Sequence, residues 1–171
     1  LKGKTLILQP NKEILEQNYN KYCLYNDNAK IYSASLKTKE FGEIVFATIG
    51  SIISSETTQR IVNNKFKDVK KYVILDFFKD VKNIIIDECH LVNSQEGLYK
   101  EILSIIKPEY LIGFTATPYR MRSFRDNKTL NQTVQAWFLT RTKTTLFKDI
   151  LFICQPKELY DNNLLTKIRY I

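Results

Sequence analysis

The sequence predicts an α/β domain with a mainly parallel central sheet, and two apolar stretches carry that prediction. Residues 84–86 are three consecutive isoleucines that run into Asp87-Glu88, and residues 111–114 run into Thr115-Ala116-Thr117. A short apolar run without alternation is typical of a strand buried on both faces. The 28 positions from Asp87 to Thr115 leave room for one helix between parallel neighbours. We expect both strands to end at the same carboxyl edge of the sheet, where α/β domains place their sites.

The length suits one domain, or one domain with the edge of another, and the charge supports an anionic partner, the alternative being the codon usage of an AT-rich genome. The 171 residues are 44% hydrophobic, enough for a sizeable core, and the net charge is +8. Such a charge favours nucleic acid. Three widely spaced cysteines (Cys23, Cys89 and Cys154) predict neither a disulfide framework nor a zinc site. No apolar run approaches about 18 residues and no signal peptide opens the chain, so we expect a cytoplasmic location and no membrane partner.

The N-terminal segment predicts a strand followed by a capped helix. Gly3-Lys4-Thr5 matches the end of the phosphate-binding loop G-x-x-x-x-G-K-[ST], but it precedes the apolar strand 6–8 instead of following a strand. We therefore do not assign it as that loop. After Pro10, apolar positions recur at helical spacing to about Tyr22, with Asn11 as the N-cap. Asn11 and Lys12 would then face a ligand from the helix N-terminus, the alternative being a capped surface helix.

The middle of the chain predicts further strands and one helix. We expect strands over 30–34 and 43–48, the second ending in Thr48, joined by a polar connection over 37–42. The apolar residues of the lysine-rich segment 57–82 suggest a helix, and they are Ile61, Val62, Phe66 and Val69. Residues 72–75 fit a strand or a helix equally well. Acidic residues are interspersed among the lysines of this segment, so a solvated basic face is favoured over a nucleic-acid site.

Beyond residue 90 we expect a helix over about 94–107, stopped by Pro108, and then a strand that includes Thr115 to Thr117. Between residues 118 and 148 seven Lys and Arg residues stand against one Asp, with Tyr119, Phe124 and Trp137 interleaved. Cations among aromatic rings suit single-stranded nucleic acid. The alternative is a basic loop with Trp137 buried in the core. A strand over 151–154, a short helix over 156–162 and a strand over 167–171 should close the chain.

Asp87 and Glu88 are the strongest candidates for chemistry. Two carboxylates at the mouth of a buried strand need a cation or a proton, which points to Asp87 for Mg²⁺ and Glu88 for a water. One alternative is a solvated acidic turn. Another is a phosphohydrolase or nuclease that uses Asp87, Glu88 and His90 as metal ligands. Neighbouring residues of a strand point to opposite faces, which makes such a two-metal site hard to assemble.

Several segments resemble superfamily 2 helicases. Asp87-Glu88-Cys89-His90 resembles their Walker B box in its DEAD/DEAH-like form, and Thr115-Ala116-Thr117 resembles their coupling motif III. Residues 113–120 are similar to those of bacterial and phage helicases related to DNA-repair helicases and restriction-enzyme motor subunits. Residues 9–15 resemble motif Ia, and Thr48 resembles the phosphate-contacting threonine of motif Ib, although many relatives carry a glutamine where Gly50 stands.

The resemblance implies a three-layer RecA-like (P-loop NTPase) domain that uses ATP and Mg²⁺. In that scheme Asp87 binds Mg²⁺, and Glu88 activates the attacking water. His90 couples nucleotide state to the segment Thr115, Ala116 and Thr117, the alternative being that His90 only packs structurally. The residues expected to contact nucleic acid, DNA more than RNA, are Pro10, Asn11, Lys12, Thr48 and Arg120.

The resemblance covers residues 1–171 as part of the first motor domain, with about 147–171 leading toward a second. The Walker A segment and the second RecA-like domain would be supplied by the parent chain, so the domain is expected to be N-terminally truncated. The predicted function is that of a fragment of an ATP-dependent helicase or translocase, inactive alone. The alternative is a nucleic-acid-binding module with the motor fold and no ATPase activity.

Overall fold

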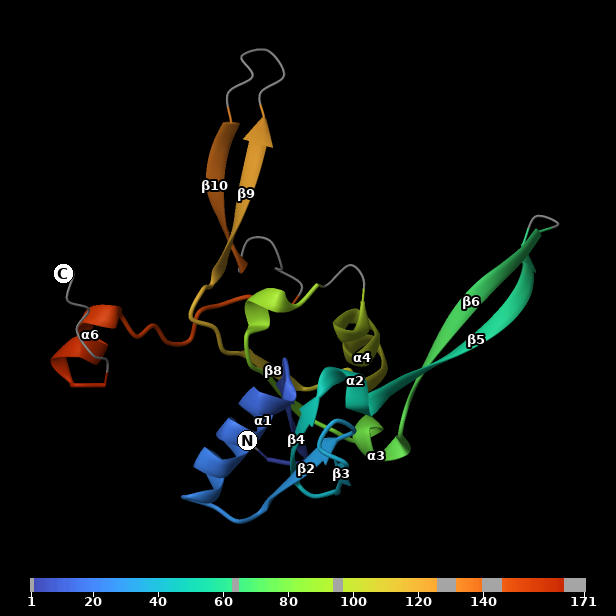
Figure 1. Ribbon diagram of the computed structural model, residues 1–171, viewed down its shortest axis with the longest axis horizontal. Coiled ribbons are helices and arrows are strands. Elements are labelled where there is room, and N and C mark those ends of the chain that lie inside the picture. The colour runs from blue at the N-terminus through green and yellow to red at the C-terminus, as the bar shows by residue number, and fades with distance from the viewer. Residues whose placement is uncertain (1, 63–64, 94–96, 126–131, 140–145, 165–171) are drawn as a thin grey trace.

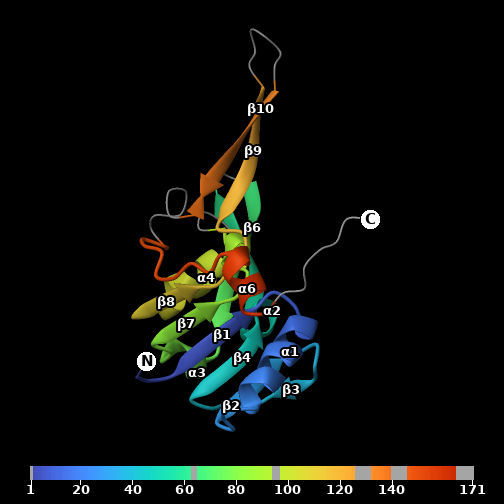
Figure 2. The same ribbon diagram turned by 90° about the vertical axis from the view of Figure 1, so that its left-hand side faces the viewer.

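The computed structural model of the chain describes residues 2–62, 65–93, 97–125, 132–139 and 146–164. Its centre is a six-stranded sheet in the order β3-β2-β4-β1-β7-β8, seen from the side in Figure 2. Five of the strands are parallel and β3 is antiparallel to β2. The strand bounds are β1 Thr5–Gln9, β2 Ala29–Ser33, β3 Thr38–Lys39, β4 Ile44–Thr48, β7 Asn83–Ile86 and β8 Tyr110–Gly113.

Helices cover both faces of this sheet, so the domain has three layers as predicted. Alternate residues of a strand point to opposite faces. Leu6 and Leu8 of β1 accordingly belong to one core cluster and Ile7 to the other. The first cluster includes residues from the helices α2 Ile49–Ile52, α3 Asp76–Lys79 and α4 Leu98–Ile106, and the second from α1 Lys12–Cys23. The carboxyl ends of the parallel strands meet at one edge, which we call the carboxyl edge.

Helix α1 forms as its sequence predicts. Asn11 has extended backbone angles, and its Oδ1 accepts a hydrogen bond of 2.9 Å from the Ile14 backbone N–H. Leu15 is fully buried against the sheet. The ring of Tyr19 packs edge-on against Phe46 of β4, with 5.7 Å between ring centroids. The expected N-cap at Asn11 is confirmed, and the helix ends one residue beyond the expected Tyr22.

Two antiparallel hairpins project from the body (Figure 1). They consist of β5 Ile53–Val62 with β6 Lys65–Ile74, and of β9 Tyr119–Arg125 with β10 Gln132–Phe138. The helix suggested by Ile61, Val62, Phe66 and Val69 is therefore wrong. These residues lie on two paired strands, with Ile61 opposite Phe66, and the segment is rich in β-branched residues that favour strands. The undecided residues 72–74 are part of β6.

Trp137 lies in β10 and is 37% exposed, so the alternative that buried it in the core is wrong, as is the loop expected there. Residues 119–125 and 132–138 pair as antiparallel strands and therefore do not form a loop. The neighbouring Leu139 occupies the core instead. The ring of Trp137 lies beside that of Phe124 on the other strand of the hairpin.

Three other expectations need correction. Strand β8 ends at Gly113, so Thr115 to Thr117 form a loop, because the chain turns away from the sheet after Phe114. Residues 37–42 include the short strand β3. Residues 151–154 form no strand, since no described strand pairs with them, and Leu151 and Phe152 are exposed.

The helix expected over 156–162 is confirmed as α6 Pro156–Asp161. Ser94, the expected start of α4, and the closing strand 167–171 lie outside the described residues. Within the described ranges, no helix has the length and apolar character needed to cross a membrane.

Gly113 allows the chain after β7 to pack closely on β8. A Cβ atom at this position would lie 2.6 Å from Cys89 Sγ, 2.7 Å from Cys89 Cβ and 2.8 Å from the Phe147 ring. Such distances are shorter than van der Waals contact. The absence of a side chain at Gly113 is therefore a condition of this packing.

Gly113→Ala is expected to lower the free energy of unfolding by about 1–3 kcal/mol, since the added methyl group must displace Cys89 or Phe147. Chemical denaturation of both proteins measures the difference. Gly50→Ala is the matched control, because a Cβ at Gly50 of helix α2 meets no atom within 4 Å. That control should be neutral or slightly stabilising. Equal stability of the Gly113→Ala variant and the unchanged chain would contradict the packing argument.

Candidate active site

The turn after β7 places two carboxylates at the carboxyl edge. Ile84 and Ile86 are fully buried, and Asp87 and Glu88 follow at once. The Asp87 N–H donates to the carbonyl of Leu8 at 3.0 Å, on the β1 side. On the other side the Cys89 N–H donates to the carbonyl of Phe114 at 2.9 Å. Main-chain hydrogen bonds to both neighbours therefore fix where the two acids lie.

Glu88 adopts a left-handed backbone conformation, with φ 50° and ψ 46°. This conformation costs a residue with a side chain about 1–2 kcal/mol. Asp87 Oδ1 offsets part of that cost by accepting the Glu88 N–H at 2.9 Å. The chain then enters a 3₁₀ turn, η1 Cys89–Leu91. The expected strand geometry, with the two acids on opposite faces, is wrong because β7 ends before them.

Asn18 of α1 orients the Asp87 carboxylate. Its Nδ2 donates to Asp87 Oδ2 at 3.0 Å and to Gln9 Oε1 at 3.2 Å. Gln9 is the last residue of β1 and is almost fully buried. Sequence reasoning missed Asn18, although there was a signal. It lies four residues from both Ile14 and Tyr22, which places a polar side chain on the apolar face of the helix.

His90 joins the acidic turn to the loop after β8. Its Nδ1 lies 2.8 Å from Thr115 Oγ1 and 3.1 Å from Glu88 Oε2. A carboxylate only accepts hydrogen bonds, so a hydrogen on Nδ1 makes both contacts favourable. Thr115 Oγ1 also accepts the Thr117 N–H at 3.0 Å. The structure thus brings together His90, Glu88 and Thr115, and it places Ala116 and Thr117 exposed beside them.

The side chains at this edge fit Mg²⁺ held by one or two carboxylates better than a metal ion enclosed by several protein ligands. In the described part of the chain, no group of three or more His, Cys, Asp or Glu side chains gathers to hold a metal ion. Mg²⁺ needs no such cage, because it keeps several waters and takes one or two carboxylates together with substrate phosphates. Asp87 can supply that carboxylate.

Burial raises the pKa of the nearby Tyr99 phenol, and the Asp87 charge acts in the same direction, so Tyr99 stays neutral.

Four of the five predicted nucleic-acid contacts lie where β1 and β4 end at the same edge. Gln9 pairs with Thr48 in the β1–β4 register, so Pro10 to Lys12 and Thr48 leave the sheet side by side. The Asn11 side chain is engaged in capping, which leaves the backbone N–H groups of the first helical turn and the exposed Lys12 to face a ligand. Thr48 Oγ1 lies 2.7 Å from Ser51 Oγ. Arg120 is part of β9, but its side chain lies outside the described residues.

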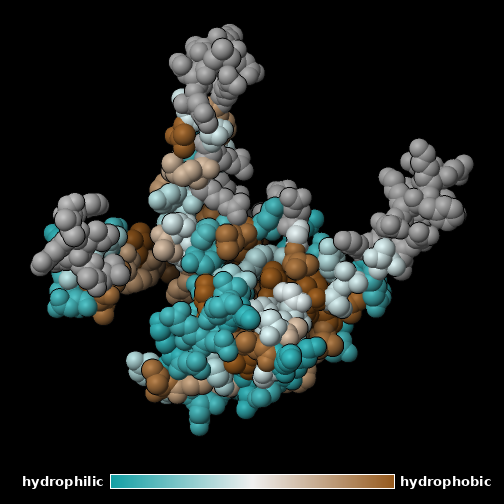
Figure 3. All heavy atoms as spheres, in the orientation of Figure 1, coloured by the Kyte–Doolittle hydropathy of each residue, from teal (hydrophilic) through white to brown (hydrophobic). Residues whose placement is uncertain are grey.

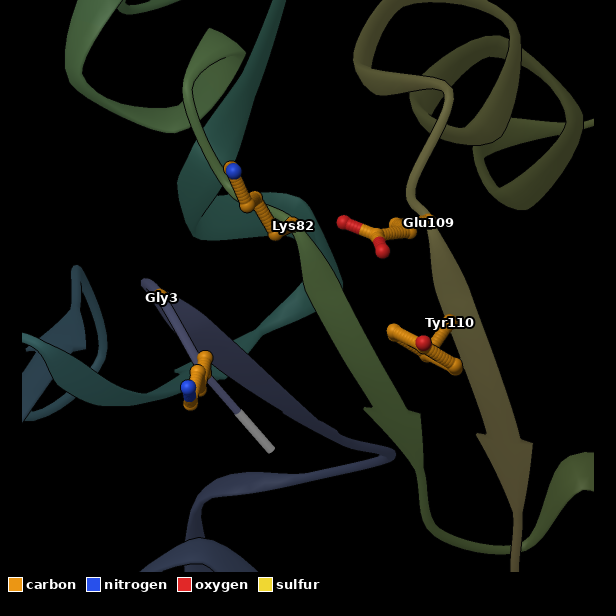
Figure 4. A pocket seen from close by; sticks show the side chains of 5 residues that line it. Gly3, Lys82, Glu109 and Tyr110 are labelled. Carbon is orange, nitrogen blue, oxygen red and sulfur yellow. The ribbon is translucent and has the colours of Figure 1, made fainter.

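The opposite edge of the sheet has a shallow hollow of about 600 Å³ (Figure 4). The residues that line it precede or begin β1, β7 and β8, and they are Lys2, Gly3, Lys82, Glu109 and Tyr110. None of the predicted site residues lines this hollow. The candidate site is therefore the carboxyl edge, where the acids, His90, the segment Pro10 to Lys12 and the end of β4 meet.

Comparison with protein families matches residues 1–120 to the family described as type III restriction enzyme, res subunit. The matched range runs from β1 through β8 to the start of β9, and so includes every candidate site residue. A comparison with curated proteins finds no match. With its three-layer architecture and mainly parallel sheet, the chain belongs to the family of type III restriction enzyme res subunits and has the fold of a RecA-like first domain of the superfamily 2 helicase-like type.

Proposed function

We propose that this domain takes part in ATP hydrolysis coupled to movement along nucleic acid, DNA more than RNA. The observation that carries the proposal is the position of His90 between the Glu88 carboxylate and the Thr115 hydroxyl. A single imidazole thereby connects an acid suited to hydrolysis with a loop 25 residues further along the chain. Such a connection is what a motor needs if nucleotide state is to alter contacts elsewhere.

Glu88 is the proposed general base. Its carboxylate would accept a proton from the water that attacks the terminal phosphate, and the left-handed turn sets its direction. The proposed role of Asp87 is to hold Mg²⁺, which when bound neutralises charge on the phosphate oxygens. Asn18 keeps the Asp87 carboxylate in place through one hydrogen bond, and the buried Gln9 keeps Asn18 in place through another.

His90 is the proposed coupling residue. When a hydrogen bond between His90 and Glu88 forms or breaks, Thr115 must adjust, because both contacts use the same nitrogen. Thr115 in turn holds the Thr117 N–H, and the chain continues from there into β9. The segment Pro10 to Lys12 and the end of β4 at Thr48 would meet phosphates through backbone N–H groups and the Lys12 ammonium.

Glu88→Gln in the full-length protein is expected to lower nucleic-acid-stimulated ATP hydrolysis by about 100-fold or more, because the amide cannot take a proton. The turn should persist, since its backbone hydrogen bonds do not involve the carboxylate. Release of phosphate measures the effect. Glu109→Gln is the matched control, at the opposite edge of the sheet, and should hydrolyse ATP at the unchanged rate. Full activity of Glu88→Gln would remove Glu88 from the mechanism and favour a binding module without ATPase activity.

His90→Ala and Thr115→Val are both expected to weaken the coupling between nucleic-acid binding and ATP hydrolysis. Each should lower the stimulation of ATP hydrolysis by nucleic acid about fivefold to tenfold, the value of one hydrogen bond of about 1–1.5 kcal/mol. The double variant should be little worse than either single one, because the two side chains share that contact. Effects that simply add in the double variant would show that the contact between them does not carry the coupling.

A further inference from the structure

The β9–β10 hairpin begins at the candidate site and is anchored in the core. Tyr119 follows the Thr115 to Thr117 loop after a single proline. At its other end the Leu139 N–H donates to the Pro118 carbonyl at 2.9 Å, and the Leu139 side chain is buried. The root is therefore closed by a hydrogen bond and held by an apolar contact. From this root the paired strands extend away from the body (Figure 1).

The register of the hairpin distributes its residues over two faces. Residues directly opposite each other in an antiparallel pair share a face, and alternate residues take opposite faces. Phe124 pairs with Thr133, and Trp137 pairs with Arg120, so these positions belong to one face. Ser123 pairs with Val134, which belongs to the other face together with Met121. Figure 3 shows apolar and polar side chains mixed along the described part of the hairpin.

Phe124 and Trp137 form an exposed aromatic pair on the first face. Their ring centroids lie 5.9 Å apart, with 31° between the ring planes. The side chains are 39% and 37% exposed, which leaves ring surface open to solvent. Arg120 and Arg122 occupy positions of the same alternating set on β9. Aromatic rings and arginines together are suited to unpaired bases, which stack on the rings, and to phosphates, which the cations attract.

We propose that this face of the β9–β10 hairpin is a binding site for single-stranded nucleic acid, separate from the segment Pro10 to Lys12 and the end of β4 at Thr48. This proposal rests on the proposed motor function, and it adds a second place at which the domain holds the same strand. A duplex hides the faces of its bases, so its bases cannot stack on the rings of Phe124 and Trp137. Single strands should therefore bind this face more tightly than duplexes.

Trp137 is the only tryptophan of the chain, so its fluorescence reports on this face alone. Titration with an oligothymidylate of about 12 nucleotides is expected to quench the fluorescence to saturation, because a base stacks on the indole. A duplex of the same length should quench it much less. Binding is measured in parallel by the anisotropy of a labelled oligothymidylate, which detects attachment anywhere on the chain.

Phe124→Ala is expected to weaken oligothymidylate binding about tenfold, the effect of one lost stacking contact. Phe124→Tyr keeps the ring and should bind within about twofold of the unchanged chain. Val134→Ala is the matched control on the opposite face of the same hairpin and should also leave binding unchanged. Arg122→Gln should reduce the slope of log affinity against log salt by about 0.7.

Two results would overturn the hairpin site. In the first, anisotropy shows that oligothymidylate binds, Trp137 is not quenched, and Lys12→Ala weakens the binding. This result would place the strand at the carboxyl edge of the sheet alone and would leave the proposed motor function standing. The other is an equal loss of binding in Phe124→Ala and Val134→Ala, which would point to a structural or protein-binding role for the hairpin. Loss of ATP hydrolysis in Glu88→Gln tests the motor function independently of either result.

Discussion

The close packing between the turn after β7 and the end of β8 is the constraint on which the site depends. The Phe114 N–H donates to the carbonyl of Ile86 at 2.8 Å, and the Cys89 N–H donates back to the carbonyl of Phe114. These reciprocal bonds require the two segments to approach closely, which Gly113 permits because it has no side chain. The left-handed Glu88 is tolerated in this frame since the residues on both sides of it are fixed. Backbone hydrogen bonds thus set where the two carboxylates lie, and side-chain contacts orient them.

Polar side chains then connect this fixed turn to two neighbouring segments. Asn18 connects Asp87 to α1, and His90 connects Glu88 to the loop after β8. Each contact is a hydrogen bond in a partly buried position, where a single bond contributes about 0.5–1.5 kcal/mol. Bonds of that size can exchange when a ligand changes the local charge. Core packing therefore sets the position of the site, and the two polar contacts connect it to α1 and to the loop after β8.

The sequence predicted those parts of the fold whose signals are local. Buried apolar runs located β1, β4 and β7, and Asn11 located the start of α1. The β5–β6 hairpin was missed because its apolar residues also fit helical spacing, and cross-strand pairing such as Ile61 with Phe66 is not visible in local periodicity. The acids and His90 were predicted as site residues from their order along the chain, and their roles stay a prediction. Asn18 was not, because its partner Asp87 lies 69 positions away.

Helix α1 connects the proposed nucleic-acid contact at Lys12 with the proposed Mg²⁺ ligand Asp87. Lys12 begins the helix beside the end of β4 at Thr48, and Asn18 lies further along the same helix against Asp87. With a rise of about 1.5 Å per residue, the two positions are about 9 Å apart along the axis. Leu15, which lies between these two positions, is fully buried and fixes the helix against the sheet. In the proposed function, one helix would therefore carry both the N-terminus that meets a phosphate and the amide that orients the Asp87 carboxylate.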